Sequence, residues 1–137
     1  MTKLDLLDIN ERGDKNFDGL SEVEKNLYVL LLFFTLHEME GITHFFSHHL
    51  THLQRVLSFL AAIDAPNWHS VRDLADFLKT RSGGTWDPEA LEEYLCNMSN
   101  EESDKIKASD HAYYSRTQEM WARAKEFVRQ RHGVEFD

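Results

Sequence analysis

The chain has 137 residues, of which 42% are hydrophobic and nine are phenylalanine, so it is long and apolar enough to form one globular core. The formal net charge of −9 disfavours direct binding to nucleic-acid phosphates. One cysteine, Cys96, excludes an intramolecular disulfide and suits the reducing cytoplasm. The acidic N-terminal segment lacks the apolar run of a signal peptide, and the longest apolar run, Tyr28 to Phe34, is too short to span a membrane. We therefore expect a cytoplasmic protein that binds neither membranes nor nucleic acid.

The acidic residues are concentrated in two segments. Residues 1–24 hold seven acids against three bases, and residues 87–110 hold eight acids against two bases. Residues 25–86 and residues 111–137 are close to neutral. This distribution predicts a basic protein partner, and the alternative is a solvated acidic surface that only aids solubility.

Residues 1–19 are predicted to be irregular, with one short turn at Leu4–Ile9. The run from Asp14 to Gly19 has the D-x-N-x-D-G spacing that begins an EF-hand calcium loop. The twelfth loop position, however, is Lys25 where a bidentate glutamate is required. Ser21 and Glu24 instead have the spacing of a capping box, which predicts that a helix begins at Glu22.

The centre of the chain is predicted to be a helical hairpin. Apolar residues nearly all round the first helix, residues 22–39, indicate that it is largely buried. Gly41 suits a bend. From Ile42 to Ile63 the apolar residues recur every three or four positions, which predicts one amphipathic helix.

Three further helices are predicted around this hairpin. The first runs from Trp68 to about Lys79, and the second begins after Asp87 with Pro88 in its first turn. Residues 99–109 are polar and are predicted to be a loop, and a last helix covers residues 111–132, with Gly133 as its C-cap. The expected fold is therefore all-α, one domain over residues 1–137, with about five helices.

Three histidines carry the strongest chemical signal. His44, His48 and His52 recur every four residues, so on one helix they lie on one side, where imidazoles can bind Zn or Ni. No H-E-x-x-H or Glu-x-x-His signature accompanies them, and no nucleophile or nucleotide motif is present. The alternative is a polar helix face, for example the seam of a homodimer. No catalytic residue is predicted, and a non-enzymatic role is favoured.

Three short motifs follow one another along the chain: Gly41-Ile42-Thr43-His44-Phe45-Phe46, Ala62-Ile63-Asp64-Ala65-Pro66 and the late pair Tyr113-Tyr114. Their order resembles that of a bacterial family of unknown function that includes an acidic DNA-mimic protein. The resemblance spans about residues 20–136. It implies an all-α fold, often dimeric, and a surface whose carboxylates imitate DNA phosphates and bind a DNA-binding protein.

The leading interpretation is therefore a small acidic helical protein that binds a basic or DNA-binding protein and needs no cofactor. The alternatives are a metal-binding bundle, which could be an enzyme, and a structural homodimer. The carboxylates expected to contact the partner are Asp14, Asp18, Asp87, Glu89, Glu92, Glu93, Glu101, Glu102 and Asp104.

Overall fold

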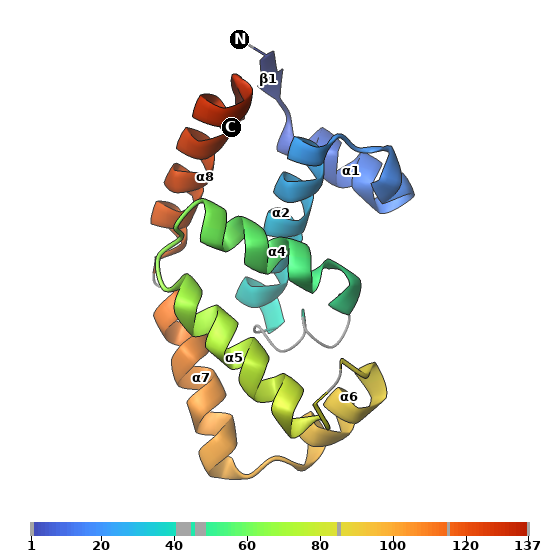
Figure 1. Cartoon of the computed structure of the whole chain (residues 1–137), viewed down its shortest axis with the longest axis vertical. Helices are drawn as coiled ribbons and strands as arrows, with labels where there is room; N and C mark the ends of the chain where they lie inside the picture. The colour runs from blue at the N-terminus through green and yellow to red at the C-terminus, as the bar shows by residue number, and fades with distance from the viewer. Residues whose placement is uncertain (1, 41–44, 46–48, 85, 115, 137) are drawn as a thin grey trace.

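A computed structural model describes residues 2–40, 45, 49–84, 86–114 and 116–136, and within them the fold is all-α (Figure 1). In chain order the elements are β1 (Thr2–Leu4), α1 (Leu6–Asn16), a 3-10 helix (Phe17–Gly19), α2 (Glu22–Glu40), α4 (Leu50–Ala62), α5 (Trp68–Arg81), α6 (Pro88–Asn97), α7 (Asn100–Tyr114), α8 (Thr117–His132) and β2 (Val134–Phe136). In this part of the chain no helix is long and apolar enough to cross a membrane.

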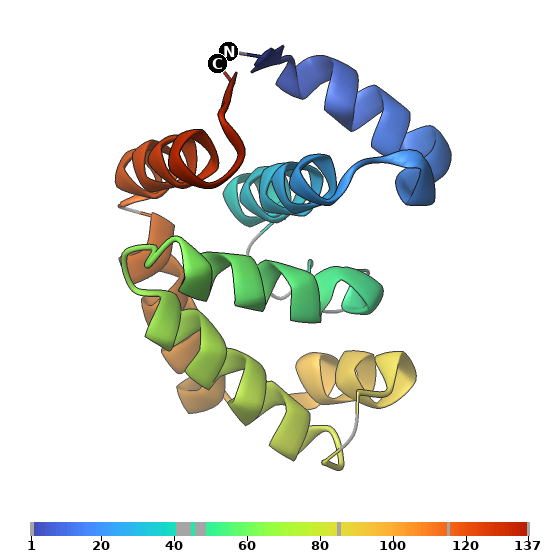
Figure 2. The ribbon, with the colours of Figure 1, turned by 45° about the horizontal axis from the view of Figure 1, so that its top comes forward.

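The two ends of the described chain meet. Strands β1 and β2 pair in parallel, with Thr2 opposite Val134 and Leu4 opposite Phe136. Figure 2 shows the termini side by side above α2 and α8. Phe136 is buried and its ring packs edge-on against Trp121 of α8, so the short sheet closes one end of the hydrophobic core.

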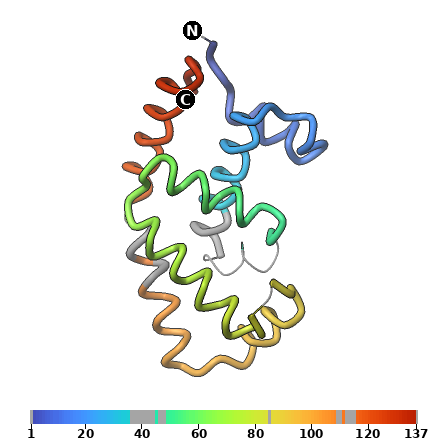
Figure 3. Tube along the Cα trace, in the orientation of Figure 1, coloured from blue at the N-terminus to red at the C-terminus, as the bar shows by residue number. Residues whose placement is uncertain are grey.

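Helix α2 lies at the centre of the core. Its consecutive residues Leu27, Tyr28, Val29 and Leu30 are all buried, which requires neighbours on every side. Helices α1, α4, α7 and α8 supply them. Helix α4 crosses α2, and the trace in Figure 3 then turns into α5, which lies beside α7.

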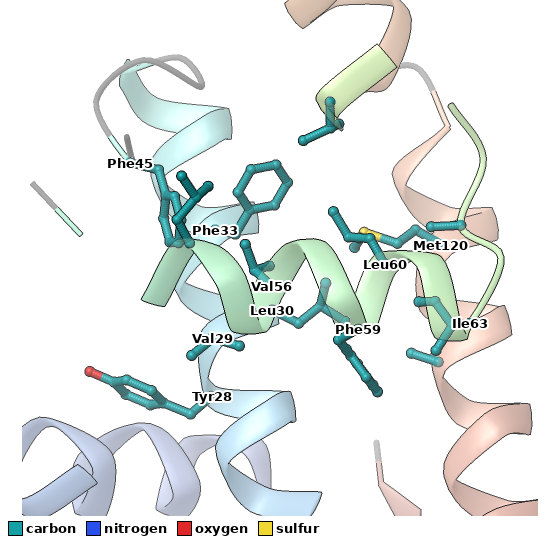
Figure 4. Close-up of a cluster of buried hydrophobic side chains, with 14 of the residues drawn as sticks. Tyr28, Val29, Leu30, Phe33, Phe45, Val56, Phe59, Leu60, Ile63 and Met120 are labelled. Atoms are coloured by element: carbon teal, nitrogen blue, oxygen red, sulfur yellow. The ribbon is translucent and has the colours of Figure 1, made fainter. Parts of the chain in front are cut away.

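The contact between α2 and α4 is built from large apolar side chains (Figure 4). Phe33 of α2 meets the buried ring of Phe45 edge-on, with the ring centroids 5.2 Å apart. Val56 and Leu60 of α4 are fully or almost fully buried in the same cluster. Each such side chain contributes about 1.5–3 kcal/mol when buried, so this cluster supplies a large share of the folding free energy.

Local sequence signals correctly place several helix ends. The Ser21–Glu24 capping box is confirmed, because Glu24 N donates to Ser21 Oγ (3.2 Å) and Ser21 N donates to Glu24 Oε1 (2.9 Å). Gly133 ends α8 in the left-handed conformation, at φ 64°. The predicted bend at Gly41 lies outside the described residues.

The prediction that residues 1–19 are irregular is wrong, because residues Leu6–Asn16 form α1. The Asp5 carboxylate caps this helix by accepting hydrogen bonds from the backbone N–H groups of Leu7 and Asp8. Only Ile9 and Gly13 of α1 are buried, so its apolar pattern is too weak to reveal the helix.

The predicted helix from Ile42 to Ile63 is also wrong in its extent. The described helix α4 begins only at Leu50, because His49 leaves the helical conformation, at φ −132° and ψ 39°. The ring of His49 lies 5.7 Å from that of Phe45 and 6.3 Å from that of His52. Both ring neighbours lie within four residues of His49, and the apolar periodicity of the sequence does not reveal the change in backbone conformation there.

The polar residues 99–109 are not a loop but most of α7, and the helix predicted from residue 111 is divided between α7 and α8. The described part of the chain thus has seven α-helices where about five were expected. The burial of Ile106 explains why this polar segment is helical: one apolar side chain anchors it in the core.

Gly13 provides a test of the packing between α1 and α2. A Cβ atom at this position would overlap the buried ring of Tyr28, whose hydroxyl donates to Asp14 (2.7 Å). Gly13→Ala gains about 1 kcal/mol of helix propensity but forces this ring to move. We expect a net loss of about 1–2 kcal/mol in the free energy of unfolding, measured with urea.

Gly19→Ala is the matched control, because its Cβ would meet only the mobile end of the exposed Asn16 side chain. We expect its effect to stay within about 0.5 kcal/mol. Stabilisation by Gly13→Ala would contradict the described packing of Tyr28.

Candidate functional site

The candidate partner surface lies where α6 and α7 leave the core. Helix α6 begins as the sequence predicts: Asp87 accepts from Glu89 N (3.1 Å), and Pro88 occupies the first turn. Leu91 is its one fully buried residue, so most of the helix surface faces solvent.

A second capping box begins α7, and sequence reasoning missed it. Glu102 N donates to Ser99 Oγ (3.2 Å), and Ser99 N donates to Glu102 Oε1 (3.3 Å). The S-x-x-E spacing of Ser99 and Glu102 was the available signal. It was overlooked because no clear apolar run follows it.

Glu102 also connects α7 to α6 and α5 through its side chain. It accepts a hydrogen bond from the hydroxyl of Tyr94 on α6 and lies 3.6 Å from Nε of Arg81 on α5. The bond from Tyr94 lowers the pKa of Glu102, and burial together with the same bond raises the pKa of Tyr94 to about 12. Glu102 is therefore a structural carboxylate rather than part of a free surface.

Six other acids form what we call the acidic end, and their side chains are exposed. They are Asp87, Glu89, Glu92, Glu93, Glu101 and Asp104. Within the described ranges none of them forms an ion pair, although Asp87 caps α6. The acids Glu22, Glu24, Glu119 and Glu126, in contrast, are all paired with arginine.

Two cations near the acidic end, Arg81 and Lys105, contact an aromatic ring, and among the described residues neither forms an ion pair with the six carboxylates of that end. The guanidinium of Arg81 lies 5.2 Å from the ring centre of Phe77. Nζ of Lys105 lies 4.6 Å from the same ring centre. The Phe77 ring in turn packs against that of Tyr94. This cluster holds the cations on α5 and α7 beside an apolar ring.

Asp14 and Asp18 do not join the acidic end. They lie on α1 and the following 3-10 helix, far along the molecule from α6 in Figures 1 and 2. The Asp14 carboxylate also accepts a hydrogen bond from the hydroxyl of Tyr28. Of the nine predicted carboxylates, six thus lie at the acidic end, Asp14 and Asp18 lie in a separate region, and Glu102 has a structural role.

Of the three candidate metal ligands, only His52 lies in the described part of the chain; His44 and His48 lie outside it. The His52 ring is half-buried and packs against Phe17, with the ring centroids 4.6 Å apart, and edge-on against Tyr28. Burial first, and then the charge of Arg55, lowers the pKa of His52 below its ordinary 6.5.

Among the residues with described positions, no three His, Cys, Asp or Glu side chains lie close enough together to hold a metal. His44 and His48 lie outside the described residues, so the Zn or Ni site stays a prediction. Since α4 begins at Leu50, a three-histidine site would need more than one straight helix.

No protein-family model, curated protein or solved structure matches this chain. The resemblance to the family with an acidic DNA mimic therefore stays a prediction from short motifs.

His52 makes stability depend on pH. Its pKa is lower in the folded state than in the unfolded chain, so the unfolded chain binds more protons as pH falls through about 6.5. Stability is therefore fully present above that pH and declines below it. We expect His52→Phe, which keeps a ring against Phe17 but cannot be protonated, to reduce the loss of stability between about pH 7.5 and about pH 5.5.

Urea unfolding at several pH values measures this difference. His69→Phe removes a histidine whose side chain is exposed on α5 and should leave the loss of stability close to that of the wild type. A His52→Phe protein that loses as much stability as the wild type over this range would contradict the described environment of His52.

Proposed function

We propose that this protein binds a basic protein through its acidic end and that the partner is a DNA-binding protein. The observation that carries the proposal is the local cluster of charge: six exposed carboxylates gather on α6 and α7 with no ion pair among the described residues, while Glu22, Glu24, Glu119 and Glu126 are each paired with an arginine. Unpaired like charges repel one another, and a cationic partner relieves that repulsion.

The arrangement along α6 supports one shared binding face. Glu89, Glu92 and Glu93 are three and four residues apart, so they lie on the same side of the helix. Glu101 and Asp104 have the same relation on α7. Carboxylates presented in rows are the chemical feature that can replace DNA phosphates in front of lysine and arginine side chains.

A DNA-binding partner is favoured by this chemistry together with the motif resemblance. The Asp87 cap of α6, the Ser99–Glu102 capping box of α7 and the Tyr94–Glu102 bond support it further, because they hold both helices in fixed positions. The exposed Cys96 thiol on α6 suits a reducing compartment, so we place the interaction in the cytoplasm.

The test uses cellular proteins that elute from double-stranded DNA, passed over the immobilised chain. We expect specific proteins to bind at low salt and to be released by rising salt and by free duplex DNA. For a bound protein, the combined change Glu89→Gln, Glu92→Gln and Glu93→Gln should weaken affinity by about tenfold to a hundredfold, because each exposed charge contributes about 0.5–1 kcal/mol.

The matched control changes the net charge equally at exposed acids away from the acidic end: Glu11→Gln, Asp18→Asn and Glu135→Gln. It should keep nearly wild-type affinity. Equal weakening by both triple variants would show that net charge alone matters, and binding that salt does not affect would contradict the proposal.

A further inference from the structure

A cleft of about 520 Å³ lies among α2, α4 and α8, away from the acidic end. In Figure 1, α4 crosses α2 and its C-terminal end lies beside α8. Its volume falls in the range of small-molecule sites. Side chains from three helices contribute to its lining, among them Asn26, Arg55, Ser58, Phe59, Phe127 and His132.

Arg55 forms hydrogen bonds from one half of its guanidinium group, and its Cζ lies 5.9 Å from the ring centre of Phe17. Nη1 donates to Glu22 Oε2 (2.9 Å) and to Asn26 Oδ1 (3.0 Å). Within the described part of the molecule, Nε and Nη2 donate no hydrogen bond. This edge of a guanidinium presents two parallel N–H groups, which match the two oxygens of a carboxylate.

The same edge of another arginine shows this geometry within the chain. Nε of Arg129 lies 3.2 Å from Oε2 of Glu126, and Nη2 lies 2.6 Å from Oε1. An external carboxylate could bind the free edge of Arg55 in the same way. Glu22, held by Nη1, is largely exposed and competes only electrostatically for that edge.

The floor of the cleft is aromatic. Phe59 is 3% exposed, and its ring meets that of Phe127 edge-on, with the centroids 5.8 Å apart. In Figure 4 the Phe59 side chain points away from the Phe33–Phe45 cluster, toward the space between α2 and α8. The ring of His132 also packs against that of Phe127, with the centroids 6.4 Å apart. Aromatic faces and edges of this kind favour a planar ring.

The charge of the lining is unusual for this protein. The chain has a net charge of −9, yet none of the described side chains that line the cleft is acidic. The hydroxyl of Ser58 and the amide of Asn26 are polar groups beside Arg55. An anion therefore meets one cation and several neutral hydrogen-bonding groups there.

We propose that this cleft binds a small aromatic carboxylate, with the carboxylate on the Nε–Nη2 edge of Arg55 and the ring against Phe59 and Phe127. The cleft is open on one side, so the bound molecule keeps one face in water. The site is independent of the acidic end, which lies on other helices.

Benzoate is a direct probe of this site. We expect its addition to the full chain, at constant ionic strength, to shift the ¹⁵N–¹H NMR signals of Arg55, Ser58 and Phe127 in a saturable manner. Benzamide, which has the ring without the charge, and acetate, which has the charge without the ring, should each bind about tenfold more weakly. No saturable shifts, or equal binding of benzamide, would overturn the proposal.

Two variants should change benzoate affinity in opposite directions. Arg55→Gln removes the charged edge and should weaken binding by about tenfold. Glu22→Gln removes the exposed anion beside Arg55 and should strengthen binding by about twofold to fivefold. The matched control Arg72→Gln, an exposed arginine of α5 outside this cleft, should bind like the wild type.

The NMR spectrum of each variant also reports whether it is folded. Equal loss of binding in Arg55→Gln and Arg72→Gln would contradict a specific site, as would weaker binding in Glu22→Gln.

Discussion

The crossing of α2 by α4 is the contact on which the other elements depend. Four consecutive residues of α2, from Leu27 to Leu30, are buried, and one helix cannot bury opposite faces alone. Helix α4 covers one face with Val56 and Leu60, while α1, α7 and α8 cover the others. Because interiors are closely packed, the positions of α1, α7 and α8 follow from the surface that this pair leaves exposed. The paired strands β1 and β2 then join the ends of the chain beside α8.

Charged side chains near this crossing form ion pairs, whereas within the described residues the carboxylates of the acidic end do not. Arg55 on α4 reaches Glu22 on α2, and Arg123 on α8 reaches Asp64 after α4, so cations near the crossing meet acids from other elements. Helices α6 and α7 lie beyond this region, and the nearby cations of Arg81 and Lys105 lie over Phe77. The carboxylates of the acidic end consequently keep their charge unpaired. The acidic end and the cleft at Arg55 thus occupy different sides of one core.

Elements with strong local signals were predictable from the sequence, and elements that depend on distant contacts were not. The caps at Ser21 and Asp87 act within a few residues, so the starts of α2 and α6 could be read directly. Helix α1 and the start of α7 also have local caps, but weak apolar patterns hid them. No residue pattern around His49 signals its departure from the helical conformation. Asn26 and His132 both line the cleft at Arg55, and no spacing in the sequence indicates that they line the same cleft.

Native-state hydrogen exchange tests the central place of the α2–α4 contact most directly. Amides whose exchange requires global unfolding mark the most stable part of a structure. We expect the slowest exchange at residues 27–33 of α2 and 56–60 of α4, with faster exchange in α1 and in α6, which bury few side chains. Exchange in these segments of α2 and α4 as fast as that in α6 would contradict this expectation.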